Sequence, residues 1–273
     1  MKKIICMLMA LLLAVSLCAC GEKTEDEKAS KDESSTTPPV IGIADETVDP
    51  TVVRDGYDKA LAYINSELNT KGMTESDQDD DGGQSLYHYW LYDHETENAD
   101  FPTEITVSGQ KIVIDTTTAK DLIDAGLKLE TTEETIEPGV IYSFQIVEGQ
   151  NRFMNVGAAN NTDKAAKGET IPITEIITTG GESSIPFTYN GITEGADLKT
   201  LLDTFGAPNL GATLCSDSMG VNITLDYFSE KTENDVRTYD QLTLNLKYDA
   251  EKDVATLLNL QLIRSLFEAE QEQ

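Results

Sequence analysis

Positive charge is scarce in this sequence, and that scarcity limits the partners the protein can bind. The chain has 20 lysines and arginines against 49 aspartates and glutamates, a formal net charge of −29 at pH 7. So acidic a surface is repelled by phosphate backbones and by anionic lipid headgroups. We therefore exclude nucleic acid as a partner and expect attraction to cations or basic surfaces. A simpler use of the charge is to keep the protein soluble at a crowded cell surface.

Long hydrophobic runs are also missing, apart from one at the N-terminus. After Lys2 and Lys3, residues 4–15 are almost wholly apolar. This run has the length of the hydrophobic region of a signal peptide and is too short to cross a bilayer. The sequence therefore predicts export of the chain rather than a membrane-spanning helix.

The apolar run ends in Leu17-Cys18-Ala19-Cys20, which resembles the lipobox of a bacterial lipoprotein signal. Leu17 fills the large apolar position and Ala19 the small one, whereas Cys18 occupies a position that usually holds Ser, Ala or Thr. The resemblance implies that residues 1–19 are removed and that Cys20 is diacylated, which anchors the protein on the outside of the cell membrane. Two acyl chains make a stable anchor where one does not. The alternative is ordinary secretory cleavage, with Cys20 left as a thiol.

Cysteine is too rare to supply a disulfide in the mature chain. Two of the four cysteines leave with the signal, residues 1–19, and Cys20 is acylated, so Cys215 stands alone. The fold must then depend on its hydrophobic core. A nucleophilic role for Cys215 would need a base, and the chain contains only His88 and His94. The sequence around Cys215 favours a small packing residue instead.

Motifs of catalysis are absent as well. The chain has no G-x-S-x-G, no phosphate-binding loop and no Cys/His cluster for zinc. Ser108 and Lys111 match S-x-x-K of penicillin-recognising enzymes only formally, because a hairpin tip is expected there and no Lys-Thr-Gly accompanies them. The sequence predicts no enzymatic activity.

Composition divides the mature chain into three parts. Residues 20–50 are rich in Glu, Lys, Asp, Ser and Thr, so they bury too little apolar surface to offset their ordering entropy and should form a lipidated, disordered tether. Residues 51–180 are expected to form an N-terminal module and residues 181–267 a C-terminal module, with a hinge near Gly180. Both should pack short helices on antiparallel strands, so the predicted fold class is α+β with two loosely similar modules.

Periodicity predicts two helices in the N-terminal module. Apolar residues recur at helical spacing over residues 52–69. A short helix should follow a cap at Thr117 or Thr118, with Leu122 and Ile123 facing inward.

Residues 86–92 are rich in aromatic side chains and are predicted to form a strand. Tyr87, Tyr89, Trp90 and Tyr92 could pack against a sheet or form a surface binding patch. The sequence leaves both interpretations open.

An acidic stretch gives the one candidate metal site. Asp77, Asp79 and Asp81, followed by Gly82, match the first half of a calcium-binding loop, in which alternate carboxylates wrap a hard cation. The second half does not match, because His88 stands where a bidentate Glu is expected. A solvated acidic loop is the alternative to a weak Ca²⁺ site, and no other cofactor is predicted.

The C-terminal module shows the clearest alternation. Apolar residues alternate with polar ones over residues 221–227 and 242–248, and residues 254–263 make a third strand. A helix is expected from about Glu194. Packing one helix on an antiparallel sheet buries both apolar faces.

A loose motif lies in this module, G-[IM]-T-x(n)-[DE]-[VL]-x(n)-[FL]-G-x-P, and its positions include Gly191, Thr193, Leu198, Gly206 and Pro208. It resembles a signature of the SmpA/OmlA envelope lipoproteins and of β-lactamase inhibitory proteins. Residues 103–263 as a whole are similar to a broad group of Gram-positive surface lipoproteins. The resemblance implies structural roles for these residues, as cap, inward leucine and helix stop, and it implies protein binding.

Together these features predict a non-catalytic binding or envelope-associated module, anchored to the cell membrane and facing outside. Its partner should be a protein or another component of the cell envelope. The alternative is a surface lipoprotein that binds a small ligand or Ca²⁺.

Overall fold

The computed structural model describes residues 50–70, 73–80, 85–92, 98–130, 135–233 and 236–268. The predicted signal peptide, residues 1–19, lies outside this described part. So does the predicted tether, residues 20–50, apart from Pro50. Thr47–Gln273 form one compact unit. No helix within the described ranges is long and apolar enough to cross a membrane.

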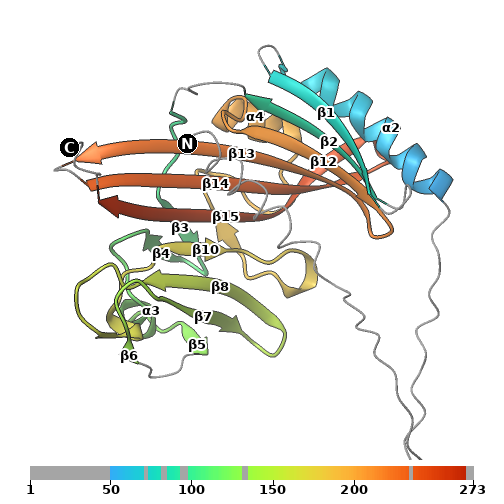
Figure 1. Ribbon diagram of the computed structural model, residues 1–273. Helices are drawn as coiled ribbons and strands as arrows, with labels where there is room; N and C mark the ends of the chain where they lie inside the picture. Colours follow the sequence, from blue (N-terminus) through green and yellow to red (C-terminus); the bar gives the residue numbers. More distant parts are fainter. Residues whose placement is uncertain are drawn as a thin grey trace, which may run out of the picture. The chain divides into compact units, whose positions relative to one another are not determined.

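The largest part of the fold is one sheet of ten strands (Figure 1). The strand order is β1-β2-β12-β13-β14-β15-β10-β8-β7-β5, and every neighbouring pair is antiparallel. The strands are β1 (Met73–Asp80), β2 (Ser85–Tyr92), β5 (Lys128–Glu130), β7 (Ile141–Glu148), β8 (Arg152–Ala159), β10 (Glu175–Ile177), β12 (Gly211–Asp217), β13 (Gly220–Glu233), β14 (Val236–Asp249) and β15 (Val254–Glu268).

The remaining elements of the described chain are two small sheets, three helices and two 3₁₀ turns. Two small sheets have the orders β11-β3-β4 and β6-β9. Their strands are β3 (Glu104–Val107), β4 (Gln110–Val113), β6 (Thr135–Ile136), β9 (Ala166–Lys167) and β11 (Phe187–Thr188). The helices are α2 (Pro50–Glu67), α3 (Ala119–Asp124) and α4 (Leu198–Phe205), with 3₁₀ turns η1 (Gly168–Thr170) and η2 (Gly181–Ser183).

The long sheet joins the two predicted modules. Strands β5, β7, β8 and β10 come from residues 51–180 and β12–β15 from residues 181–267, and Ile176 of β10 pairs with Leu262 of β15. Gly180 also packs closely, since a Cβ there would lie 2.4 Å from a Leu258 methyl carbon. The predicted boundary at 180/181 therefore does not separate two units. The predicted packing of short helices on antiparallel strands is confirmed, whereas the predominance of strands makes the fold β-rich rather than α+β.

The alternation read from the sequence sets the register of the central strands. Leu225 pairs with Leu244 and Leu244 with Leu260, and all three side chains are buried. We call the side of the sheet that carries them the inner face. A slip of one residue would turn every one of these side chains to the other side, so the apolar pattern specifies this register.

Helix α2 confirms the first predicted helix. The apolar residues on its inward side, including Tyr57 and Ile64, are buried, and it packs on β12, β13 and β2. The Ser216 hydroxyl donates a hydrogen bond of 2.9 Å to the Val53 carbonyl, which ties the helix to the inner face. Gly56 permits this approach, because a Cβ there would lie 3.0 Å from a Val221 methyl.

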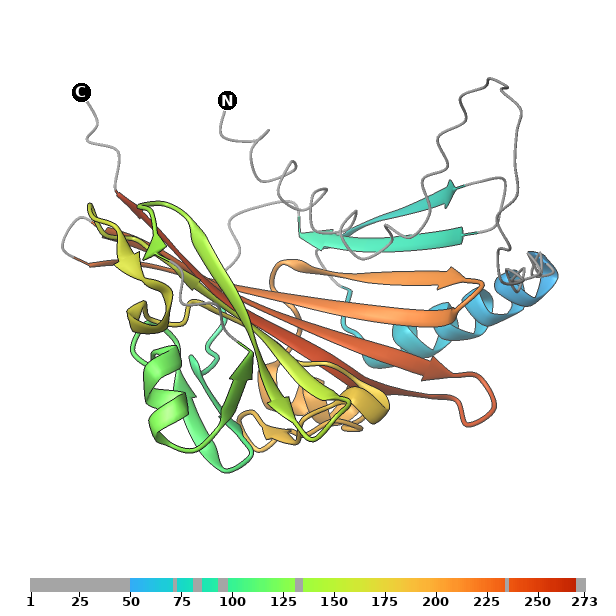
Figure 2. The ribbon, with the colours of Figure 1, turned by 90° about the horizontal axis from the view of Figure 1, so that it is seen from below.

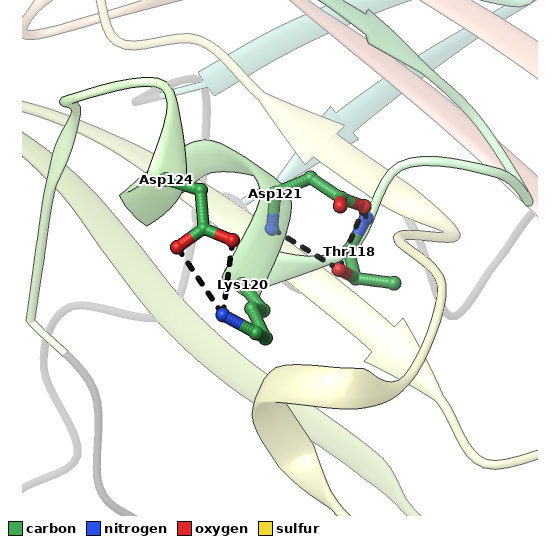
Figure 3. Close-up of polar contacts among 4 residues, drawn as sticks. All are labelled: Thr118, Lys120, Asp121 and Asp124. Carbon is green, nitrogen blue, oxygen red and sulfur yellow. Dashed lines mark hydrogen bonds and ion pairs between the residues drawn. The ribbon is translucent and has the colours of Figure 1, made fainter.

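Helix α3 begins with the capping box drawn in Figure 3. The Thr118 hydroxyl accepts the Asp121 backbone N–H, and the Asp121 carboxylate accepts the Thr118 backbone N–H at 2.9 Å. This confirms Thr118 as the cap. Leu122 is buried as predicted, whereas Ile123 is 43% exposed, so its predicted inward position is wrong. One turn and a half of helix presents only a narrow apolar stripe to the core.

Two of the motif residues belong to helix α4, Leu198 at its start and Gly206 at its C-cap. Leu198 is buried, and Gly206 ends the helix at a φ of 76°, a backbone conformation that glycine adopts readily. The cap is Asp197, whose carboxylate accepts the Thr200 N–H at 2.7 Å. The helix therefore starts four residues after the predicted Glu194, because Asp197 completes the N-terminal hydrogen bonding.

The other motif residues lie outside the helix. Gly191, with a φ of 82°, follows Asn190 in a tight turn closed by hydrogen bonds between Tyr189 and Ile192. Thr193 is exposed and Pro208 is buried after the helix end. An Asn-Gly pair suits such a turn, since both residues tolerate positive φ.

Candidate functional site: the outer face of the long sheet

The described helices cover one face of the ten-stranded sheet, and the opposite face forms the candidate site. Helix α2 contacts two residues of the inner face, Val221 and Ser216. On α4, the ring centroid of Phe205 lies 5.9 Å from that of Tyr227, which is also on the inner face. Figure 2 shows α2, α3 and α4 on the same side of the long strands. The opposite side, which we call the outer face, carries the alternate residues of the same strands. In the middle of β13, β14 and β15 these are Asn222, Thr224, Asp226, Phe228, Gln241, Thr243, Asn245, Lys247, Asn259, Gln261 and Ile263.

Amide and hydroxyl side chains bond to one another across the middle of the outer face. Thr224 donates to the Asn245 carbonyl oxygen at 2.9 Å, and the Asn245 amide donates to the Asn259 oxygen at 2.8 Å. Each bond joins neighbouring strands, so three strands carry one polar ladder. Cross-strand pairs of this kind fix the side chains in place.

Asp226 is the only acidic residue among the outer-face positions of β13–β15 named above. Its carboxylate accepts the Thr243 hydroxyl at 2.7 Å, and Gln241 donates to the Thr243 oxygen at 3.3 Å. Burial raises the pKa of Asp226 to about 6, and hydrogen bonding from Thr243 opposes this rise. The Asp226 carboxyl therefore becomes charged as the pH rises through about 6, rather than near pH 4 as an ordinary Asp does.

A hollow of about 360 Å³ opens on the outer face where β7, β8 and β10 meet. Gln145, Asn155 and Glu175 line it, and Gly157 leaves space for the Glu175 side chain. The Gln145 amide donates to the Asn155 oxygen at 2.9 Å. The Gln261 amide donates to a Glu175 oxygen at 2.8 Å, which links the hollow to the central ladder.

The aromatic strand β2 divides its side chains between the two faces. Trp90 and His88 are buried on the inner face, with ring centroids 4.2 Å apart. Tyr87 and Tyr89 lie on the outer face and stack at 6.1 Å. Packing in the core is therefore confirmed for Trp90, whereas a binding patch at Tyr87 and Tyr89 stays a prediction, because successive residues of a strand point to opposite faces.

The acidic stretch predicted as a loop is mostly strand β1. Asp77 and Asp79 lie in β1, and Asp81 lies outside the described residues. Asp77 pairs with His88, so the first and twelfth positions of the suggested calcium loop face each other across a hairpin. Pairing with β2, which has strong β-forming residues, overrides the polar sequence. Among the described residues no group of three or more acidic, His or Cys side chains could hold a metal.

The Asp77 carboxylate joins α2 to this hairpin. It accepts the Tyr57 hydroxyl at 2.5 Å, and the Nδ1 of His88 lies 2.7 Å from the same oxygen. Because a carboxylate accepts only, Nδ1 carries the proton. The hydrogen bond from Tyr57, and after it the one from His88, holds the pKa of Asp77 below its usual range. Burial raises the pKa of Tyr57. The cluster braces α2 against β1 and β2.

Cys215 and His88 lie on opposite faces of the sheet. Cys215 pairs with Tyr87 and Asn222 and belongs to the outer face, whereas His88 is buried on the inner face. The two cannot form a nucleophile and base pair in this fold, and His94 lies outside the described residues.

A buried ion pair on the inner face went unrecognised in the sequence. Arg264 donates two hydrogen bonds to Asp240, at 2.6 and 2.8 Å, and the Asp240 side chain is 3% exposed. Asp115, after β4, lies 4.0 Å from the same guanidinium. The pair joins β14 to β15 at the point where the β3–β4 hairpin packs.

The outer-face residues were also missed. Their signal was present, because Thr243 and Asn245 alternate with the leucines that predicted the core. Glu175 and Gln261, by contrast, are 86 residues apart in sequence, and only the β10–β15 pairing brings them together.

Comparison with known proteins found no match among family models, curated proteins or solved structures. The lipobox and motif resemblances therefore stay predictions.

Proposed function

We propose that the protein is a membrane-anchored surface lipoprotein that acts as a non-catalytic binding module, with the outer face as its binding surface. Support for the anchor comes from the lipobox around Cys20. Residues 20–50 support display away from the membrane, since a flexible coil of about 30 residues spans roughly 30 Å. The partner is a protein or another component of the cell envelope.

The observation that carries this proposal is the shortage of charge in the middle of the outer face, between Glu230 and Arg237 toward one end of the strands and Lys247 and Asp249 toward the other. Charged residues make up 25% of the chain, yet the middle of the outer face carries amides, hydroxyls and aromatic rings around Asp226. Solvent-facing strands of an antiparallel sheet are usually polar. Depletion of charge among them is instead typical of the centre of a protein interface.

A crosslinking experiment on intact cells tests the binding surface. A photo-reactive amino acid at Thr224, on the outer face, should capture a partner, which is then identified by mass spectrometry. The matched control carries the same group at Lys120, which is exposed on α3. Equal capture from both positions, or none from Thr224, would contradict the proposal.

The anchor is tested separately by metabolic labelling with a fatty-acid analogue. The wild-type protein should be labelled and a Cys20→Ser variant should not. Equal labelling of both would remove Cys20 as the acylated residue.

A further inference from the structure

The hollow between β7, β8 and β10 combines one carboxylate with neutral polar groups. Its volume of about 360 Å³ lies in the lower part of the range for small-ligand sites. Glu175 is half-buried, and one of its oxygens accepts the Gln261 amide. The other oxygen projects over Gly157, where a Cβ would approach it to 2.9 Å.

The neutral surroundings make this carboxylate distinctive. Gln145, Asn155 and Ser143 line the same hollow and are uncharged, and the Glu175 partner Gln261 is an amide. Within the described residues no cationic side chain lies within 4 Å of the Glu175 carboxylate. A charge in such a setting interacts more strongly with an opposite charge than one that is fully exposed to water.

The walls of the hollow add apolar surface to this polar floor. Ile177 lines it, and Ile141, which is 59% exposed, has a methyl 3.5 Å from the Cβ position of Gly157. A ligand that fits has a compact positive end for Glu175 and an aliphatic stem for the isoleucines. A lysine side chain has this form, with an ammonium on a flexible four-carbon stem.

We propose that this hollow binds a protonated primary amine on an aliphatic stem, such as the lysine side chain of a basic partner. Glu175 pairs with the ammonium, and the Gln145 and Asn155 side-chain oxygens accept its remaining N–H groups. The chain's net charge of −29 would draw basic partners toward the surface before contact. The inference rests on the proposed function, because it names the chemistry that the outer face recognises.

Nuclear magnetic resonance of the ¹⁵N-labelled full-length protein in uncharged detergent tests it. The probe is N-acetyl-lysine methylamide, and its norleucine counterpart, which lacks the amine, is the ligand control. The lysine probe should shift the Gly157 backbone signal and the side-chain amide signals of Gln145 and Asn155. Glu175→Gln should weaken binding at least tenfold, equivalent to about 1.4 kcal/mol. Glu251→Gln, on the exposed β14–β15 turn, removes the same charge and should leave binding unchanged.

Three outcomes would overturn the proposal. First, the lysine probe could bind Glu175→Gln as tightly as it binds the wild type. Second, the norleucine probe could bind the wild type as well as the lysine probe does. Third, the shifts could spread over the acidic surface, and Glu251→Gln could weaken binding as much as Glu175→Gln. None of these affects crosslinking from Thr224 on cells, so failure of the amine site and failure of the proposed function are distinguishable.

Discussion

Replacing Asp226 by Asn should stabilise the protein at neutral pH and have little effect in acid. Asn keeps the oxygen that accepts the Thr243 hydroxyl at 2.7 Å and removes the charge that burial disfavours. The pKa of Asp226 is about 6 in the folded protein, against an ordinary value of 3.8. A group whose pKa is raised by folding stabilises the folded state below the unfolded pKa, and this stability is lost as pH rises through the folded pKa.

The magnitude follows from these two values. They differ by about 2, and each pKa unit corresponds to about 1.4 kcal/mol. Because Asp226 is half-buried rather than wholly enclosed, we expect a gain of about 1 to 3 kcal/mol above pH 6.5 and almost none below pH 4. For a domain of this size that is about 2 to 10 °C in the unfolding midpoint.

Urea unfolding of both proteins at several pH values between 4 and 8 measures the effect. The difference between the two stabilities isolates Asp226, since every other group titrates in both. Asp163→Asn, at an exposed position, controls for the loss of one negative charge. A stability difference that stays flat with pH, or that favours the wild type at pH 8, would refute the reasoning.

Two further substitutions test the other structural conclusions. Thr118→Ala removes the cap of α3 and leaves the Asp121 N–H without its side-chain acceptor. It should lower the free energy of unfolding by about 1 kcal/mol, measured by thermal melting. No change in stability would mean that the end of α3 is frayed. Arg264→Met leaves the buried Asp240 carboxylate unpaired and should cost about 3 to 5 kcal/mol, measured by urea unfolding. Adding Asp240→Leu should restore most of the lost stability, because replacing both members of a buried ion pair by apolar groups changes stability little. A double variant as unstable as Arg264→Met alone would contradict this account.

Local patterns in the sequence were sufficient for much of the fold. The alternation at Leu242, Leu244 and Leu246 predicted both the strands and their inner face, because side chains of a strand repeat with period two. Thr118 and Gly206 marked helix ends for reasons that lie within a few residues of each. These features depend only on neighbours along the chain.

Strand β1 shows where local reasoning fails. Its sequence, with Asp77 and Asp79, has almost no strand propensity, yet it pairs with the aromatic strand β2 over eight positions. The partner and the hydrogen bonds of Asp77 to Tyr57 and His88 outweigh the preference of the segment itself.

What the sequence determined by itself is the acidity of the chain, the scarcity of cysteine, and the apolar side of each long strand. Only the tertiary structure decided that all ten strands join one sheet, that Cys215 and His88 face opposite ways, and that Glu175 meets Gln261 above Gly157. The physical reason is that pattern and propensity act between residues close in sequence, whereas strand order depends on which distant surfaces bury each other best.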